Sequence, residues 1–180
     1  MKIILTLACL LSLNFALAQH QIGVKLTYGN FFESVGFGVK GNNYFNHLFN
    51  FSGELLYYPG TSSRTAESTV DTKDVAINID AHYKFNDDRD GYIIYAIGGV
   101  HYSYYTVLTT FDSRTIQQDA ITFTTIGGDT DKFARSYMGL NFGVGGNYQI
   151  QDRIHALAEL KYVWSELGQL VFGVGVVYEL

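Results

Sequence analysis

Hydrophobic and polar residues alternate along most of the chain, from Gln21 to its end. A period of two is typical of β-strands whose two faces meet different environments. Polar or glycine-containing links interrupt the alternation and divide it into separate segments. We expect eight strands at residues 21–30, 34–41, 48–58, 75–85, 92–105, 134–148, 154–164 and 169–180.

The two faces of the predicted strands have opposite character. One face is apolar nearly throughout, as Val24, Leu26 and Tyr28 of the first strand illustrate, and it holds no charged residue. The opposite face collects glycines, histidines and charges. Unpaired charges in a low-dielectric lumen are costly, so charges that share such a lumen should pair with one another. We therefore predict an ion-pair network of Lys25, Lys40, Glu54, Asp80, Lys84, Arg135, Glu159 and Lys161.

The links between the strands differ in length at the two ends of the set. Short links at 42–47, 86–91 and 149–153 fall at one end, while 31–33, 59–74, 106–133 and 165–168 fall at the other. An even number of strands with short turns at one end and longer loops at the other is typical of an outer-membrane barrel. Both long links lie at the end that would face outward.

The lumen of an eight-stranded barrel is just wide enough for side chains to fill it. The large apolar side chains would overfill that lumen, whereas glycines and a few charges would fit. A lipocalin-like soluble exported barrel, with the apolar face inside around a ligand, is the alternative. We predict an all-β, eight-stranded antiparallel up-and-down transmembrane β-barrel with its apolar face against lipid.

The first 18 residues have the composition of an export signal. Lys2 precedes an apolar run, and Ala16-Leu17-Ala18 has the small-x-small pattern of a cleavage site. We expect a signal peptide at 1–18 and a barrel domain at 19–180; an N-terminal membrane anchor is the alternative. The only cysteine, Cys9, lies in this segment, so the mature barrel should hold neither a disulfide nor a thiol metal site.

Aromatic residues collect at both ends of the predicted strands, where amphipathic rings suit the lipid headgroups. The expected external girdle is Tyr28, Tyr57, Tyr58, Tyr102, Tyr104, Tyr105, Tyr162 and Trp164; the internal one is Phe49, Tyr83, Phe85, Tyr92, Tyr148 and Tyr178.

Composition and short motifs exclude several classes of function. The formal net charge is −5 and no basic run occurs, so we expect no nucleic-acid partner. Gly36, Gly38 and Gly41 have the spacing of a dinucleotide loop, but no helix follows them. Residues 86–91 begin like a calcium loop, but Ile97 stands where such a loop needs a glutamate. We expect no cofactor and no metal.

One pair of residues offers an enzymatic alternative. His101 and Ser103 have the spacing of the His-x-Ser motif of lipid A deacylases, which the segment resembles. That resemblance implies a histidine base and a serine nucleophile. No glutamate lies within the 50 residues after Ser103 to orient the histidine, and both side chains should point into the lumen. A lipid A-modifying hydrolase is therefore the alternative function.

The two long links should differ from each other. Residues 59–74 are rich in serine and threonine, which predicts a mobile loop. Residues 106–133 contain two alternating runs, Thr106–Phe111 and Ala120–Ile126. We expect these runs to extend the fifth and sixth strands beyond the membrane as a hairpin that binds an extracellular protein or surface ligand by strand addition.

Over residues 19–180 the chain resembles the small outer-membrane β-barrel family of the OmpA/OmpX type. Its C-terminal residues Gly175, Tyr178 and Leu180 have the spacing of the signal read by the outer-membrane insertion machinery. Leu180 stands where that family most often ends in phenylalanine. The resemblance implies a monomer in the outer membrane, bounded by lipid, with a non-enzymatic structural or surface-interaction role and a lumen too narrow for a general pore.

Overall fold

The computed structural model describes residues 20–31, 33–64, 68–86, 91–111, 114–118, 122–126 and 130–180. The expected signal peptide lies outside these residues and stays a prediction. No helix in the described part of the chain could cross a membrane. The strands are β1 (His20–Gly29), β2 (Ser34–Tyr44), β3 (Phe49–Tyr58), β4 (Ser62–Arg64), β5 (Ser68–Lys84), β6 (Tyr92–Phe111), β7 (Arg114–Gln118), β8 (Thr122–Ile126), β9 (Thr130–Gln151), β10 (Ile154–Trp164) and β11 (Gln169–Glu179).

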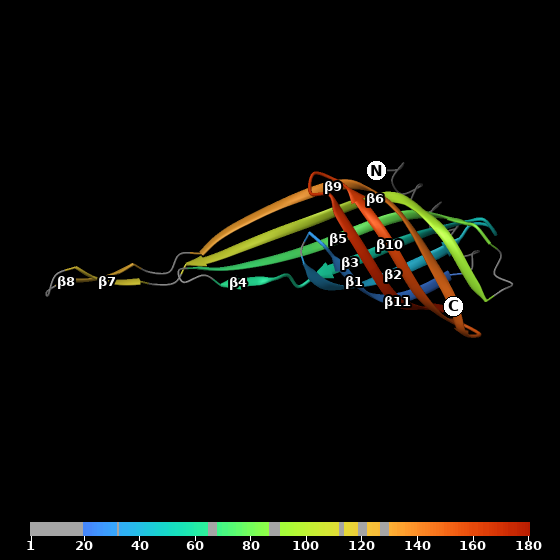
Figure 1. Ribbon diagram of the computed structural model, residues 1–180, viewed down its shortest axis with the longest axis horizontal. Helices are drawn as coiled ribbons and strands as arrows, with labels where there is room; N and C mark the ends of the chain where they lie inside the picture. Colours follow the sequence, from blue (N-terminus) through green and yellow to red (C-terminus); the bar gives the residue numbers. More distant parts are fainter. Residues whose placement is uncertain are drawn as a thin grey trace, which may run out of the picture.

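Eight of the strands close into an antiparallel barrel (Figure 1). Their order is β3-β2-β1-β11-β10-β9-β6-β5, and pairing of β3 with β5 completes the ring. The first and last strands are neighbours, with Gln21 opposite Glu179 and Gly29 opposite Val171. The predicted transmembrane barrel of eight up-and-down strands is confirmed.

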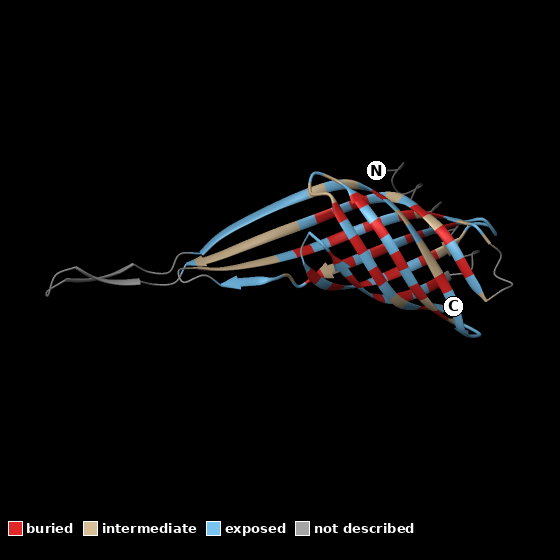
Figure 2. Cartoon of the chain, in the orientation of Figure 1, coloured by how far each residue is buried: buried red, intermediate tan, exposed pale blue. Residues whose placement is uncertain are grey.

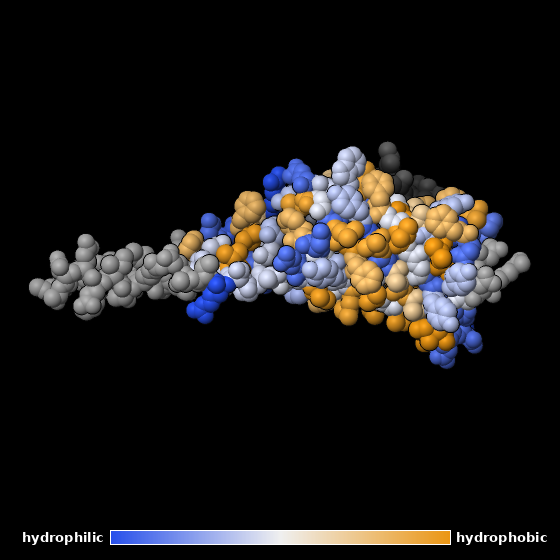
Figure 3. Space-filling view, viewed as in Figure 1, coloured by the Kyte–Doolittle hydropathy of each residue, from blue (hydrophilic) through white to orange (hydrophobic). Residues whose placement is uncertain are grey.

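Burial alternates residue by residue around the barrel wall (Figure 2). Val24 is 64% exposed, whereas the next residue, Lys25, is 3% exposed. The apolar face therefore points outward and the charged face points into the lumen, which excludes the soluble barrel. Figure 3 shows the outward hydrophobic side chains spread over the barrel, with hydrophilic residues towards its ends.

The aromatic girdles follow the prediction with two exceptions. All six internal residues are exposed on the lipid face, from Tyr178 at 42% to Tyr148 at 63%. Tyr58, expected in the external girdle, is only 2% exposed and packs with Leu56 and Ala76 inside the barrel. Tyr105 packs against the same cluster. Because side chains alternate between the two faces of a strand, Tyr58 and Tyr105 both point towards the lumen and cannot belong to the lipid-facing girdle.

Three strands extend well beyond the external end of the barrel (Figure 1). β5, β6 and β9 pair there, with Ser68 opposite Phe111 and Thr110 opposite Thr130. β4 adds to β5 through Ser62 and Asp71. The prediction that 59–74 forms a mobile loop was therefore wrong at 62–64 and 68–74. The physical reason is that β6 extends beyond the barrel and has backbone N–H and C=O groups that need hydrogen-bond partners. The β-branched and small polar residues of 68–74 supply these partners by continuing β5 as a strand.

The second alternating run of the long link takes a different partner from the expected one. Residues 122–126 form β8 and pair with β7 in a separate two-stranded sheet, with Arg114 opposite Ile126. The first run, Thr106–Phe111, continues β6 as expected. The sixth barrel strand, β9, instead begins at Thr130. The second run pairs with β7 because β7 is only a few residues away in the sequence, so that closing the hairpin costs little conformational entropy.

Candidate functional site

A network of six charged side chains fills the middle of the lumen. Lys161 Nζ lies 2.6 Å from Glu54 Oε2 and 3.2 Å from Asp80 Oδ2. Lys25 Nζ lies 2.9 Å from Glu159 Oε2 and also pairs with Glu54. Lys40 pairs with Glu159. This lumen network therefore comprises Lys25, Lys40, Glu54, Asp80, Glu159 and Lys161, with three positive and three negative charges that balance.

Neutral polar side chains complete the hydrogen bonds of the lumen network. The Tyr95 hydroxyl donates to Glu159 Oε1 at 2.9 Å. The Asn78 amide donates to Glu54 Oε2 at 2.9 Å, and the Asn141 amide donates to Asp80 Oδ1 at 2.7 Å. Sequence reasoning missed these residues because it considered only charges. The signal was present, since both asparagines occupy lumen-side positions of the two-residue repeat.

Glycines make room for the long charged side chains. Gly143 lies opposite Lys161 in the register of β9 and β10, and Gly175 lies opposite Lys25 in that of β11 and β1. A Cβ atom at Gly143 would lie 2.9 Å from Lys161 Cα, and one at Gly175 would lie 2.6 Å from Lys25 Cβ. Each charged side chain can therefore cross the neighbouring strand only where that strand has no side chain.

Apolar clusters lie on both sides of the lumen network. Towards the internal end, Ile93, Ile97 and Leu157 join Tyr95 and Val177 in one buried cluster. Towards the external end lies the second cluster, around Leu56. On β10 Leu157 lies one pleat to the internal side of Glu159, and on β3 Leu56 lies one pleat to the external side of Glu54. The lumen network thus lies between two apolar clusters, and buried polar side chains such as Asp74 and Asn147 share the lumen with them. Because these side chains are almost inaccessible to solvent, the described lumen is filled.

Two residues predicted for the network lie elsewhere. Arg135 pairs with Glu166 at 2.8 Å, and their side chains are 53% and 68% exposed. β10 pairs with β9 only as far as Leu140, so no wall encloses Arg135. The Lys84 ammonium lies 4.1 Å from the centroid of the Tyr44 ring at the internal end of the barrel. The prediction was wrong for Arg135. Lys84 has the predicted lumen-side parity, but it lies at the internal end of β5, away from the six residues of the lumen network.

His101 and Ser103 do not form the geometry of a catalytic pair. They are 6% and 3% exposed, and both point into the lumen. His101 Nδ1 lies 2.7 Å from Asn78 Oδ1, and the Ser103 side chain bonds to Asp74. Each side chain is thus bonded to a different residue of β5. A lipid substrate outside the barrel could not reach either group.

The other motifs take structural roles. Gly36, Gly38 and Gly41 lie within strand β2, and no helix follows them in the described chain. Asn86 bonds across its own hairpin, where its Oδ1 accepts from Ile94 N at 2.7 Å. Asp88 and Asp90 of the calcium-like segment lie outside the described residues. No group of three metal-ligating side chains occurs among the residues that the structure describes.

Beyond the barrel, β4, β5, β6 and β9 form a protruding sheet with an open edge. β6 pairs with β9 from Thr130 onward, but β10 reaches β9 only at Leu140. One side of β9 at residues 131–137 thus lacks a partner strand in the described part of the chain. Phe133 is 56% exposed on this strand. An open strand edge is a template for pairing with another chain.

The predicted assembly signal lies at the internal end of the last strand. Tyr178 is 42% exposed and Leu180 is 72% exposed on the lipid-facing side, while Gly175 faces the lumen. Both side chains are accessible from outside the folded barrel. Their role in assembly stays a prediction.

Several solved outer-membrane barrels share this fold. The chain is 15% identical to the N-terminal barrel domain of Pseudomonas aeruginosa OprF, with a TM-score of 0.58 over 91% of this chain and 99% of that chain. It is 14% identical to Yersinia pestis Ail, with a TM-score of 0.56 over 91% and 97%. A major outer membrane protein from Thermus thermophilus gives a TM-score of 0.65 at 10% identity, over 91% and 100%.

Sequence comparison gives the family directly. No curated protein matches the chain. The family described as "Outer membrane protein beta-barrel domain" matches residues 3–179, which is nearly the whole chain. Its strands, its lipid-facing apolar wall and its filled lumen all agree with that match. The chain therefore belongs to the outer membrane protein beta-barrel domain family and is located in the outer membrane.

Proposed function

We propose that this protein is a non-enzymatic outer-membrane barrel that binds partners at the cell surface through its protruding sheet. The observation that carries the proposal is the open edge of β9 at residues 131–137, outside the barrel wall. At about 3.3 Å per residue, these seven residues offer an edge of roughly 23 Å for strand addition. The barrel then serves as an anchor in lipid.

The filled lumen supports a role without catalysis or general transport. The lumen network is balanced, and apolar clusters lie on both sides of it. The side chains of His101 and Ser103, the catalytic candidates, are buried and bonded to different residues. Buried, satisfied polar groups specify and stabilise a fold more often than they react.

The chemistry of the open edge favours a protein partner. The crystal structure of Ail with sucrose octasulfate shows a heparin analogue bound to that protein. This chain has a net charge of −5 and no basic run, which disfavours a polyanion. An open strand edge offers backbone groups, which an extended peptide segment can pair with. We therefore propose an extracellular protein with an exposed extended segment.

The test compares cells that display variants of the chain on an array of immobilised matrix and serum proteins. Ala134→Lys places a charge on the open strand, which should block strand addition. Thr110→Lys is the matched control, because Thr110 lies on the central strand β6 and is paired on both sides. A variant that lacks residues 110–128 tests the distal hairpin.

We expect A134K to lose binding that T110K keeps. We also expect the bound protein to protect backbone amides of residues 131–137 from hydrogen exchange. Equal binding by A134K, T110K and the deletion variant would contradict a recognition role. If those variants bind normally but cells without the chain become sensitive to detergent, the role is structural instead.

A further inference from the structure

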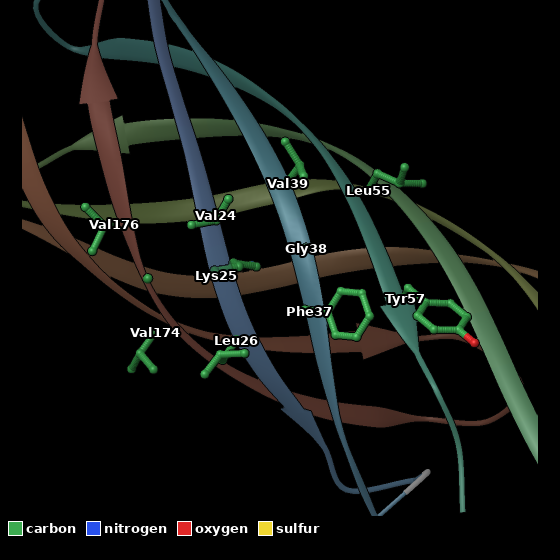
Figure 4. A pocket seen from close by; sticks show the side chains of 11 residues that line it. Val24, Lys25, Leu26, Phe37, Gly38, Val39, Leu55, Tyr57, Val174 and Val176 are labelled. Atoms are coloured by element: carbon green, nitrogen blue, oxygen red, sulfur yellow. The ribbon is translucent and has the colours of Figure 1, made fainter.

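A groove crosses the lipid-facing wall of the barrel over β11, β1, β2 and β3 (Figure 4). Its volume is about 660 Å³, within the range of roughly 300–1,000 Å³ that ligand sites have. Apolar side chains form its walls, and the labelled residues come from four adjacent strands. The lining side chains are Val24, Leu26, Phe37, Val39, Leu55, Tyr57, Val174 and Val176.

The floor of the groove is backbone. Lys25, Gly38 and Gly175 line it, but the Lys25 side chain is fully buried in the lumen and the glycines have none. At the middle of the groove the residues directly opposite one another are short, namely Val24 and Val39, whereas Leu26 and Phe37 face each other on its external side. Short side chains over bare backbone leave a depression between longer neighbours.

An aromatic pair marks the external side of the groove. The rings of Phe37 and Tyr57 meet edge to face, with centroids 5.3 Å apart. Phe37 lies one pleat to the external side of Val39, and Tyr57 lies one pleat to the external side of Leu55. The groove therefore runs inward from a phenol at the headgroup level towards the middle of the bilayer. A phenol at that level suits a lipid ester or headgroup oxygen.

The surroundings select hydrocarbon as the occupant. The groove is continuous with the exposed apolar wall that meets lipid, for example at Phe172, which is 50% exposed. A second copy of the chain fits poorly, because a two-fold axis would set one concave surface against another. A flexible acyl chain can fill the depression and gain the van der Waals contacts that an empty groove forfeits.

We propose that this groove binds one acyl chain of a lipid of the external leaflet, with the headgroup beside the Tyr57 hydroxyl. Binding there is a property of the wall and does not depend on the partner of the protruding sheet. The acyl chain descends past Phe37 and packs on the valines that line the groove.

Photolabelling of the whole processed chain in phosphatidylcholine vesicles tests the site. The probe is a phosphatidylcholine with a diazirine in the middle of one acyl chain, and adducts are mapped by mass spectrometry. Val24 and Val39, 64% and 50% exposed, are compared with Ile79 and Val144, which are 60% and 53% exposed outside the groove. We expect about fivefold more adducts in the groove, the ratio that about 1 kcal/mol of packing gives.

Substitutions then distinguish a specific acyl-chain site from the general contact of the barrel wall with lipid. Val39→Phe should reduce labelling at Val24 to the level of Ile79, while Val144→Phe, the same change outside the groove, should leave it unchanged. Electrophoresis with and without boiling shows whether each variant is folded. The labelling of the unsubstituted chain decides the proposal even if V39F does not insert.

Three outcomes would overturn the proposal. Labelling in proportion to exposure on all faces would show annular lipid only. Adducts between two chains at groove residues would show a second copy. A diazirine close to the ester should label Tyr57; labelling at Val176 instead would show that the lipid enters from the internal leaflet.

Discussion

Lys161 and Glu54 are separated by 107 residues in the sequence, and their side chains meet at 2.6 Å in the middle of the lumen. The two residues come from β10 and β3, on different parts of the barrel wall. Their contact, with that of Lys25 and Glu159, ties the wall together across the lumen. Loss of one of these charges should therefore weaken the whole barrel.

Lys161→Met should destabilise the barrel by about 3–5 kcal/mol, because it leaves Glu54 and Asp80 buried with one cation fewer. The measurement is the free energy of unfolding in urea, with the folded chain in vesicles. Arg135→Met is the control, since its ion pair is exposed and should contribute less than about 1 kcal/mol.

The double variant Lys161→Met, Glu54→Met sharpens this test. It restores the charge balance of the lumen network, so it should be more stable than K161M alone. A double variant that is less stable by the sum of both single effects would show that the residues contribute independently.

Gly143→Ala should destabilise the barrel by about 1–3 kcal/mol, because the added methyl group forces the backbone at Lys161 to shift. Gly53→Ala is the matched control on the lipid face, where a Cβ would meet nothing within 4 Å. The fraction of heat-modifiable protein on electrophoresis reports both effects. Equal loss of folded protein in the two variants would contradict the packing argument.

Tyr178→Ser and Leu180→Ser should reduce the amount of barrel in the outer membrane of cells, while leaving refolding into detergent micelles nearly unchanged. The reason is that both residues belong to the predicted assembly signal, which only the insertion machinery reads. Val176→Ser, on the same face of β11, is the control. A parallel loss in cells and in micelles would assign the defect to stability.

His101→Ala and Ser103→Ala should leave the mass spectrum of lipid A unchanged in cells that express the chain. Both side chains are buried in the lumen and bonded to different residues of β5. A loss of one acyl chain from lipid A that depends on His101 would instead assign an enzymatic activity.

The barrel itself could be predicted because alternation fixes which residues share a face. Lys25 and Val24, for example, had to lie on opposite sides of any wall built from β1. The positions at which the strands enter and leave the membrane could also be predicted, since turn residues and aromatic residues mark them. β10 occupies residues 154–164, as the pattern indicates.

What the pattern could not give depends on contacts between distant strands. Arg135 has the parity of a lumen residue, but the neighbouring strand ends too early to enclose it. Asn78 and Asn141 meet in the lumen only because β5 and β9 both pair with β6, which brings the Asn141 amide within 3.1 Å of Asn78 Oδ1. The outer half of β5 is a strand because β6 extends far enough to pair with it. Each of these depends on register and strand length, which local alternation does not specify.

The pairing of Gln21 with Glu179 has a consequence for biogenesis. Closure needs β11, the last barrel strand to be synthesised, so the ribosome must finish all eight strands before the cylinder can form. Until then the edges of β1 and β11 are unpaired. Their backbone N–H and C=O groups and the apolar face of the strands can then bind to other copies of the chain, which leads to aggregation. The unfolded copies must therefore be kept apart on their way to the membrane. A chaperone that does this would have to cover the unpaired edges of β1 and β11.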